Sequence, residues 1–272
     1  MSQMEFRERV AHLERRGRLC VGLDPHPDHL PEHLACDREG VGRFLGAIIE
    51  ATSPYAVAYK PNCAFYEALG SWGWEILESL RSVIPSDKLL IVDGKRGDVG
   101  HTAERYAHAA FHTIGADALT ASPYLGADSL EPYLTHPGKG VFLLCHTSNP
   151  GAVEWQALKI DGEPLYLRLA RWAAALSQHG NVGLVAGATR PESLRQIREA
   201  APELPLLIPG VGAQKGDLAA TVRAAYGVPY FINASRSITG ASRGRDFADA
   251  AAEAAATLHQ AITDAESALV GT

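Results

Sequence analysis

Short apolar runs rich in β-forming residues alternate along this chain with helix-like stretches, and this alternation limits the folds that it can adopt. The expected strands are Arg18–Leu23, Ala56–Lys60, Leu89–Val92, Ala118–Ala121, Val141–His146, Val182–Ala186, Leu206–Pro209 and Pro229–Asn233. The expected helices include Ala64–Leu80, Thr102–Thr113, Pro164–Gln178, Pro191–Ala200, Gly216–Ala225 and Phe247–Thr263. Eight strand-then-helix units in 272 residues match a (β/α)8 TIM barrel in size and count. The alternative is a doubly wound open sheet, but the Gly-x-Gly-x-x-Gly turn that it would carry after the first strand is missing.

The domain organisation is expected to be simple, with one barrel domain over residues 1–272 and an N-terminal helix. Between Ser2 and Arg18, the apolar residues Phe6, Val10 and Leu13 recur at helical intervals among charged residues, which predicts an amphipathic helix. The longest irregular segment, 147–162, follows the fifth strand. We expect it to be a functional loop, because barrel connections are usually shorter.

Composition and charge exclude several classes of function. The net charge of −6 and the sequence pI of about 6.0 give no general attraction to nucleic acid or to an anionic membrane. The N-terminal stretch lacks the uninterrupted apolar run of a secretory signal, and no segment approaches the roughly 20 apolar residues of a transmembrane helix. We therefore expect a cytoplasmic protein that binds any anionic ligand at a local site.

A charged cluster, Asp93-Gly94-Lys95-Arg96-Gly97-Asp98, follows the third expected strand. Active sites of (β/α)8 barrels lie at the carboxyl ends of the strands, so polar residues at these ends are the candidates for chemistry. The candidates are Asp24, Lys60, Asp93, Lys95, Ser122, His146, Thr189, Gln214 and Arg236.

The first four of these candidates alternate in charge, so each lysine is expected to lie between carboxylates if they converge on one mouth. A lysine in such a position remains an ammonium ion, which is a poor Schiff-base nucleophile but a good proton donor. The alternative is a network of ion pairs that only ties the strand ends together.

The second half of the chain carries a pattern typical of phosphate binding. Pro209-Gly210-Val211-Gly212-Ala213-Gln214 follows the seventh strand and directs Gly-flanked backbone amides at a ligand. Asn233-Ala234-Ser235-Arg236 follows the eighth strand and adds a fixed positive charge that can grip phosphate with two donors. The loops after strands seven and eight are the usual phosphate position in this fold. The predicted ligand is a small phosphorylated molecule.

Two further features receive no functional assignment. His101, His108 and His112 fall on one helical face, but no carboxylate partner accompanies them, so we expect no metal site. Arg96 is expected to face solvent or an interface.

Taken together, these motifs resemble the orotidine 5′-phosphate decarboxylase family, in its longer bacterial branch. The signature is Asp93-x-Lys95-x-x-Asp98 after the third strand. The other matching segments are Val21-Gly22-Leu23-Asp24-Pro25, Tyr59-Lys60-Pro61-Asn62, Thr147-Ser148-Asn149-Pro150-Gly151, residues 209–214 and Ser235-Arg236-Ser237-Ile238. The resemblance covers nearly the whole chain and implies a TIM barrel that decarboxylates orotidine 5′-monophosphate in pyrimidine biosynthesis.

The resemblance also implies roles for the charged residues. Asp24 and Lys60 would contact the ribose hydroxyls, and Asp93 would lie beside the substrate carboxylate. Lys95 would protonate C6 of the pyrimidine as carbon dioxide leaves. Asp98 and Thr102 would reach the neighbouring subunit's site, which makes the enzyme a homodimer with shared active sites.

For the remaining contacts, the resemblance implies that Ser148 binds the pyrimidine amide and communicates with Gln214. Gln214 and Arg236 would hold the phosphate, with Pro209 and Ser235 as substrate-binding residues in the same two segments. No cofactor and no metal would be needed.

Two alternatives remain open on the sequence. The magnesium-dependent 3-keto-gulonate-phosphate decarboxylases and hexulose-phosphate synthases share the Asp-x-Lys-x-x-Asp pattern, but they place a metal-binding acid at strand two, where this chain has Lys60. A non-catalytic phosphate-binding barrel is the other alternative, although a binder would not need so much buried charge.

Overall fold

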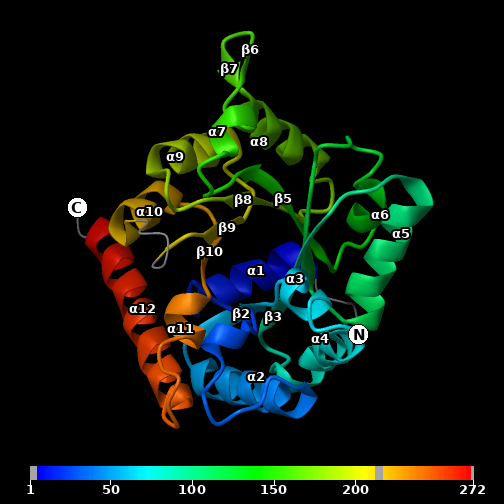
Figure 1. Cartoon of the computed structure of the whole chain (residues 1–272). Coiled ribbons are helices and arrows are strands. Elements are labelled where there is room, and N and C mark those ends of the chain that lie inside the picture. Colours follow the sequence, from blue (N-terminus) through cyan, green and yellow to red (C-terminus); the bar gives the residue numbers. More distant parts are fainter. Residues whose placement is uncertain (1–4, 212–216, 271–272) are drawn as a thin grey trace.

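A computed structural model describes residues 5–211 and 217–270 of the chain, and its centre is a closed barrel of eight parallel strands (Figure 1). The barrel strands are β1 (Leu19–Gly22), β2 (Ala56–Lys60), β3 (Leu89–Arg96), β4 (Ala118–Ala121), β5 (Gly140–His146), β8 (Val182–Ala186), β9 (Leu206–Pro209) and β10 (Tyr230–Ala234). Neighbours in the chain are neighbours in the barrel, and β10 closes it by pairing with β1, with Leu19 opposite Ile232. This is the (β/α)8 architecture that the alternating pattern predicts.

Helices surround the barrel and connect its strands. They are α1 (Phe6–Glu14), α2 (Arg38–Thr52), α3 (Cys63–Glu67), α4 (Ser71–Val83), α5 (Gly100–His108), α6 (Glu131–Leu134), α7 (Ala152–Trp155), α8 (Leu165–Leu176), α9 (Pro191–Ala200), α10 (Leu218–Ala225), α11 (Arg236–Thr239) and α12 (Phe247–Val270). A short 3₁₀ turn, Pro27–His29, follows β1, and a π-helical turn, Ala109–Thr113, continues α5.

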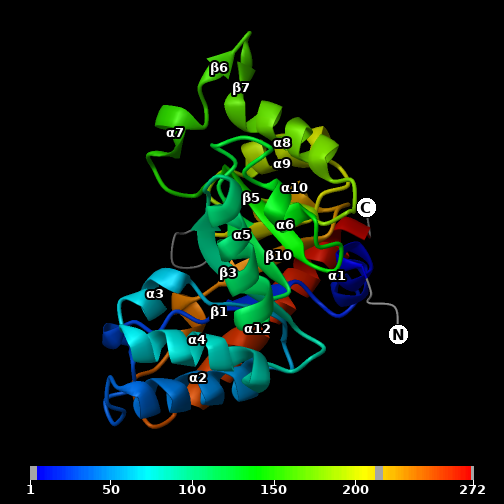
Figure 2. The ribbon, with the colours of Figure 1, turned by 90° about the vertical axis from the view of Figure 1, so that its right-hand side faces the viewer.

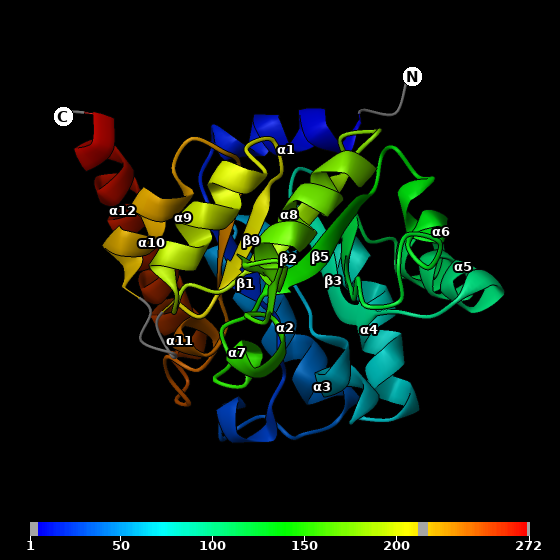
Figure 3. The same ribbon diagram turned by 90° about the horizontal axis from the view of Figure 1, so that it is seen from above.

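The predicted N-terminal helix is present as α1, and it closes one end of the barrel. Phe6, Val10 and Leu13 are buried together with inward-facing strand residues in one apolar cluster. The Phe6 ring meets Phe142 edge-on, with 6.1 Å between the ring centroids. Figure 3 shows α1 at one end of the barrel and α3 and α7 toward the other. The open end is therefore the one at which the strands finish.

The structure corrects two of the expected boundaries. The expected helix Ala64–Leu80 is two helices, α3 and α4, because Gly70 adopts a left-handed backbone conformation with φ of 75° between them. The expected third strand ends at Val92, whereas β3 continues to Arg96 through the charged cluster. Hydrophobic patterning does not predict this continuation, because the apolar run ends before Asp93 and the remaining strand residues are polar or glycine.

The segment expected as an irregular loop after β5 contains structure of its own. It holds the short helix α7 and leads into a two-stranded antiparallel hairpin, β6 (Lys159–Ile160) and β7 (Glu163–Pro164). Figure 2 shows this hairpin projecting beyond the helices that surround the barrel. Among the helices of the described residues, none has the length and apolarity that a membrane crossing requires.

Candidate active site

A cavity of about 780 Å³ opens at the carboxyl ends of the barrel strands. Its wall contains side chains from most of the strand ends and from the loops that follow them. The lining residues are Asp24, His26, Asp28, His29, Lys60, Asn62, Phe65, Asp93, Lys95, Thr120, Leu144, Thr147, Ser148, Asn149, Gln156, Val185, Leu207, Pro209, Gly210, Val211, Asn233, Ser235 and Arg236. The cavity thus lies at the end of the barrel where the sequence predicts a site.

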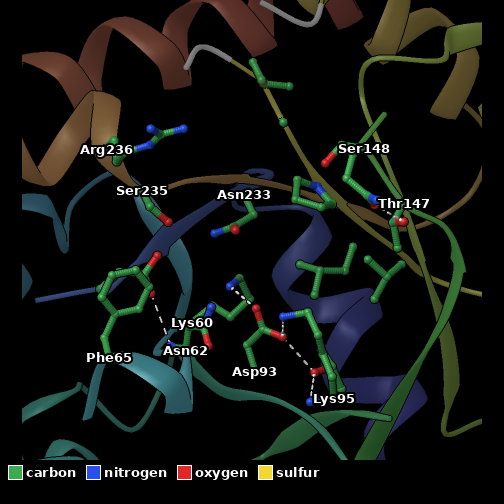
Figure 4. A pocket seen from close by; sticks show the side chains of 18 of the residues that line it. Lys60, Asn62, Phe65, Asp93, Lys95, Thr147, Ser148, Asn233, Ser235 and Arg236 are labelled. Atoms are coloured by element: carbon green, nitrogen blue, oxygen red, sulfur yellow. Dashed lines mark hydrogen bonds and ion pairs between the residues drawn. The ribbon is translucent and has the colours of Figure 1, made fainter. Parts of the chain in front are cut away.

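Asp93 forms ion pairs with Lys60 and Lys95 on one wall of this cavity, and these three residues are the Lys60–Asp93–Lys95 cluster (Figure 4). Asp93 Oδ2 accepts a hydrogen bond from Lys60 Nζ at 2.7 Å, and its Oδ1 accepts one from Lys95 Nζ, also at 2.7 Å. The side chains of Lys60 and Asp93 are 6% and 10% exposed, whereas that of Lys95 is 48% exposed. Lys95 is therefore the member of the cluster that a ligand in the cavity can reach most easily.

The electrostatics of the cluster keep its buried members charged. Burial alone would raise the pKa of Asp93, but the ammonium groups of Lys60 and Lys95 hold it well below its ordinary value. Burial alone would lower the pKa of Lys60, but the carboxylates of Asp93 and Asp24 raise it to about 12. Asp93 is therefore a carboxylate and Lys60 an ammonium ion near neutral pH.

Asp24 completes the alternation of charge that the sequence predicts. It follows β1 and lines the cavity, and its Oδ1 accepts a hydrogen bond from the backbone N–H of Asn62 at 3.2 Å. This bond ties the end of β1 to the turn after β2. Lys60 thus lies in the field of two carboxylates, as expected, while the Lys95 ammonium group pairs with Asp93 alone among the described residues.

The opposite wall carries the expected phosphate-binding residues. Pro209, Gly210, Ser235 and Arg236 line the cavity, and Figure 4 shows Arg236 and Ser235 across it from Asp93. No carboxylate of the described residues forms an ion pair with Arg236, so its guanidinium donors are available for an anion. Gln214, the remaining predicted residue of this wall, lies outside the described residues.

The close approach of two strand ends explains the glycine at the end of β1. A Cβ on Gly22, at the end of β1, would lie 1.8 Å from Ser235 Oγ. Only glycine therefore lets β1 and the turn after β10 come together at this position.

Ser148 and Thr147 bring the loop after β5 to a third side of the cavity (Figure 4). The Ser148 carbonyl accepts a hydrogen bond from Thr189 Oγ1 at 3.2 Å. Thr147 N–H donates to Gln156 Oε1 at 2.8 Å, which links the start of the loop to the end of α7. The loop is thus fixed at both of these points with its polar groups beside the cavity.

Several residues that the sequence reading selected lie elsewhere. His146 ends β5, and Ser122 and Thr189 follow β4 and β8, but none of the three lines the cavity. A register shift between Leu144 and His146 accompanies the turn of the His146 ring away from the barrel, where it stacks on Tyr166 of α8 with ring centroids 4.4 Å apart. The position of His146 at a strand end does not by itself predict this register shift.

Asp98 and Thr102 also lie outside the wall of their own chain's cavity. Asp98 Oδ1 accepts a hydrogen bond from the adjacent backbone N–H of Val99 at 2.8 Å. Arg96 points to the outside of the barrel, where it pairs with Glu67 at 2.8 Å and lies over the ring of Tyr106 at 4.9 Å. It thus links β3 to α3 and α5.

Other cavity residues were not among the candidates predicted from the sequence, notably Asn62, Phe65, Thr120 and Asn233. Thr120 has a signal in the sequence, since it is a polar residue in the apolar fourth strand. Asn62 also has a signal in the sequence, since it is a polar residue in the matching segment Tyr59-Lys60-Pro61-Asn62.

The expected histidine face is divided in the structure. His108 and His112 stack with ring centroids 5.0 Å apart, and the His136 ring lies 5.9 Å from that of His112, while His101 is exposed. Within residues 5–211 and 217–270, no group of three or more histidine, cysteine, aspartate or glutamate side chains has an arrangement that could hold a metal ion.

Comparisons with known proteins agree with this geometry. A sequence model of the orotidine 5′-phosphate decarboxylase / HUMPS family matches residues 17–251. The orotidine 5′-phosphate decarboxylase of Roseiflexus sp. (strain RS-1) is 50% identical over 269 residues, which cover 96% of this chain and 98% of that protein. The protein of the same name from Herpetosiphon aurantiacus is 51% identical over 249 residues, which cover 91% of this chain and 93% of that protein.

A solved structure gives the same result. That of Leishmania donovani OMP decarboxylase matches with a TM-score of 0.85 and 38% identity, over 96% of this chain and 98% of that one. With matches of this extent, the chain belongs to the orotidine 5′-phosphate decarboxylase / HUMPS family.

Proposed function

We propose that this protein decarboxylates orotidine 5′-monophosphate to uridine 5′-monophosphate and carbon dioxide, as a step of pyrimidine biosynthesis, without a cofactor or a metal. The observation that supports it most is the Lys60–Asp93–Lys95 cluster on one wall of the cavity, opposite the guanidinium of Arg236, which pairs with no carboxylate of the described residues. Proteins that carry this activity in their names match the chain over nearly its full length.

In the proposed reaction, the bond between C6 and the carboxylate breaks and its electron pair stays on C6. Lys95 Nζ stabilises the developing negative charge and then donates a proton to C6, which balances the loss of carbon dioxide. Lys95 Nζ lies beside Asp93 Oδ1, and the Lys95 side chain is half-exposed at the cavity, so the ammonium group is well placed for this role. The Asp93 carboxylate would lie near the substrate carboxylate and disfavour the bound ground state, a contribution whose size is debated.

The remaining cavity residues would bind the rest of the nucleotide. Asp24 and Lys60 would contact the ribose hydroxyls, and Ser148 would contact the pyrimidine amide. Arg236, with Pro209 and Ser235 from the same wall, would hold the phosphate, together with Gln214, which lies outside the described residues. Binding energy from the phosphate, which is remote from C6, can be used to order the site around the reacting carbon.

We also propose that two copies of the chain form a homodimer in which Asp98 and Thr102 complete the partner's cavity. Both residues lie outside their own chain's cavity. Val99, Tyr124 and Leu125, which are 53%, 73% and 41% exposed, are apolar residues that a second copy would cover. The four cysteines are free thiols and Cys36 is exposed, which suits the reducing cytoplasm in which we place the enzyme.

No observation favours the magnesium-dependent alternative. Lys60 stands at the end of β2, where that branch is expected to place an acid, and a buried ammonium ion would repel a divalent cation. The matched relatives are instead named orotidine 5′-phosphate decarboxylase.

The assay that tests the proposal follows the ultraviolet absorbance of orotidine 5′-monophosphate mixed with the purified protein. We expect a time-dependent change whose rate is proportional to enzyme concentration and is unaffected by a metal chelator. An absence of change at every enzyme concentration would refute the proposed activity. Activity that a chelator abolishes and magnesium restores would support the alternative branch.

The shared site is tested by mixing inactive subunits. Asp98→Ala and Lys95→Ala variants should each be inactive, but their mixture should regain activity, because one of the two sites in a mixed dimer then has both residues intact. Mixed dimers that are verified by mass and remain inactive would place Asp98 in its own subunit's site. A mixture of wild-type and Lys95→Ala subunits provides the calibration.

A further inference from the structure

Thr120 is a residue of the cavity wall whose hydroxyl connects the two charged groups at the end of β3. It lies in β4 and is 1% exposed. Its Oγ1 accepts a hydrogen bond from the backbone N–H of Lys95 at 2.9 Å and donates one to Asp93 Oδ1 at 2.8 Å. One buried hydroxyl therefore contacts both residues of the motif on which the proposed chemistry depends.

The backbone opposite Thr120 is irregular. β3 and β4 are in register where Val92 faces Leu119 and again where Arg96 faces Ala121, so three residues of β3 lie opposite Thr120 alone. Such a bulge interrupts the ladder of backbone hydrogen bonds and can redirect side chains next to an active site. The Thr120 hydroxyl accepts the Lys95 N–H within this irregular stretch.

The bulge also contains an unfavourable backbone conformation. Lys95 has φ of 47°, in the left-handed region that residues other than glycine rarely adopt. Such conformations persist only where the surrounding structure holds them, and they often occur at functional sites. The bond from Lys95 N–H to Thr120 Oγ1 is an interaction that holds this one.

The direction of the hydrogen bonds is fixed by the groups involved. An ionised carboxylate can only accept, so the hydroxyl proton of Thr120 is directed at Asp93, and its oxygen remains free to accept from the Lys95 N–H. Asp93 Oδ1 then receives both the Thr120 hydroxyl and Lys95 Nζ, while Oδ2 receives Lys60 Nζ.

From these contacts, we propose that Thr120 is a positioning residue for the decarboxylation, whose hydroxyl holds the β3 bulge so that Lys95 Nζ stays against Asp93 at the cavity wall. The inference rests on the roles proposed above for Asp93 and Lys95. Thr120 itself need not touch the reacting atoms.

The test uses substitutions that separate the hydroxyl from the shape of the side chain. Thr120→Val keeps the branched shape and removes the hydroxyl, and we expect kcat to fall by about 10- to 100-fold with KM changed by less than about threefold. Thr120→Ser keeps the hydroxyl and should retain kcat within about threefold of the wild type. Thr120→Ala provides a second hydroxyl-free variant if Thr120→Val does not fold, and Thr120→Ser should then exceed it in kcat by at least about tenfold.

A matched control is a second buried threonine outside the cavity. Thr52 is fully buried in α2, where its Oγ1 donates to Ile48 O at 2.7 Å and lies 3.0 Å from Tyr59 Oη. Thr52→Val should lower the melting temperature, as removal of a buried hydroxyl does, but leave kcat unchanged.

Three outcomes would overturn the inference about Thr120. They are full kcat in a folded hydroxyl-free variant, equal losses of kcat in Thr120→Ser and Thr120→Val, and a loss of kcat in Thr52→Val as large as that in Thr120→Val. A wild-type protein without turnover would instead refute the proposed function, so the two failures can be told apart.

Discussion

Two buried aspartates at opposite ends of the barrel, Asp93 and Asp117, place the same chemical group in two different environments. Asp93 lies in β3 at the open end and is 8% exposed, while Asp117 lies just before β4 at the end covered by α1 and is 6% exposed. Each is held by two cationic side chains, lysines for Asp93 and the arginines Arg9 and Arg81 for Asp117. The difference lies in the type of cation and in what surrounds the pair.

Asp117 is enclosed by donors that hold it in one place. Besides the two guanidinium groups, its Oδ2 accepts a hydrogen bond from the backbone N–H of Leu90 at 2.8 Å, and Arg81 also donates to the backbone carbonyls of Ile84 and Pro85. Arginine stays charged at all ordinary pH values and cannot deliver a proton. This network ties α1, α4, β3 and β4 together.

Asp93 is instead held by lysines, and one of them, Lys95, is half-exposed to a cavity. A lysine ammonium can transfer a proton, and an exposed one can reach a ligand. We therefore propose that the ion pair at the open end serves chemistry, because its lysine can release a proton and one side of the pair faces a cavity.

The largest predicted effect tests the aspartate at the open end. Asp93→Asn keeps the shape of the side chain but removes the charge that offsets two ammonium ions, and we expect kcat to fall by at least about 10³-fold. The change is measured by the absorbance assay, with circular dichroism to verify folding. A folded variant that retains more than about a tenth of the wild-type kcat would contradict the proposed role.

The same substitution at the other end should lower stability but leave activity intact. Asp117→Asn leaves the Arg9 and Arg81 guanidinium groups without their carboxylate, and loss of one partner of such a network costs about 3 kcal/mol of unfolding free energy. Urea unfolding measures this loss, while kcat should stay within about twofold. Unchanged stability, or a loss of kcat comparable to that of Asp93→Asn, would remove the distinction between the two ends.

The stability that the Asp93–Lys60 pair contributes should depend on pH at both extremes. Asp93 has a pKa below its ordinary value of 3.8, so its contribution is present above that value and is lost as the pH falls through the lower pKa of the folded state. Lys60 has a pKa raised from 10.5 to about 12, so its contribution is present below 10.5 and is lost as the pH rises through about 12. The difference in unfolding free energy between the wild type and Asp93→Asn should therefore be constant at neutral pH and shrink toward both limits. A difference that shrinks between pH values of about 5 and 9 would contradict these shifts.

The last predicted effect concerns a buried group, His146, that has no counter-charge among the described residues. Neither ring nitrogen of His146 has a hydrogen-bond partner among the described residues, and burial, with Arg190 nearby, lowers its pKa from 6.5 to about 4. The unfolded chain therefore binds a proton at a higher pH than the folded one, and stability is lost as the pH falls below 6.5. We expect the unfolding free energy of His146→Gln to fall less steeply than that of the wild type between pH 6.5 and about 4. Equal slopes would indicate that His146 does not titrate as described.

The comparison also shows which parts of the molecule could be predicted from the sequence. The eight strands were predictable because buried parallel strands are continuous apolar runs, and Asp24, Lys60, Asp93, Ser235 and Arg236 follow those runs. Position after a strand correctly predicted that these five residues share one cavity, although it also selected Ser122, His146 and Thr189, which do not line it.

The rest depends on irregular backbone that hydrophobic periodicity does not encode. The bulge in β3 opposite Thr120, the turn of His146 out of the barrel and the helix break at Gly70 each follow from local geometry. The partners of Asp117 are distant in sequence from it, since Arg9 lies in α1 and Arg81 in α4, so only the folded chain brings them together.

The measurement that tests the central claim most directly is the turnover and ligand affinity of Lys95→Ala. Because Lys95 is half-exposed and Asp93 keeps its bond to Lys60, the variant should fold and bind uridine 5′-monophosphate within about tenfold of the wild-type affinity. Its kcat should fall by at least about 10³-fold, since the substitution removes both the proposed proton donor and the charge proposed to stabilise C6. A folded variant with kcat within about tenfold of the wild type would show that Lys95 is not the proton donor.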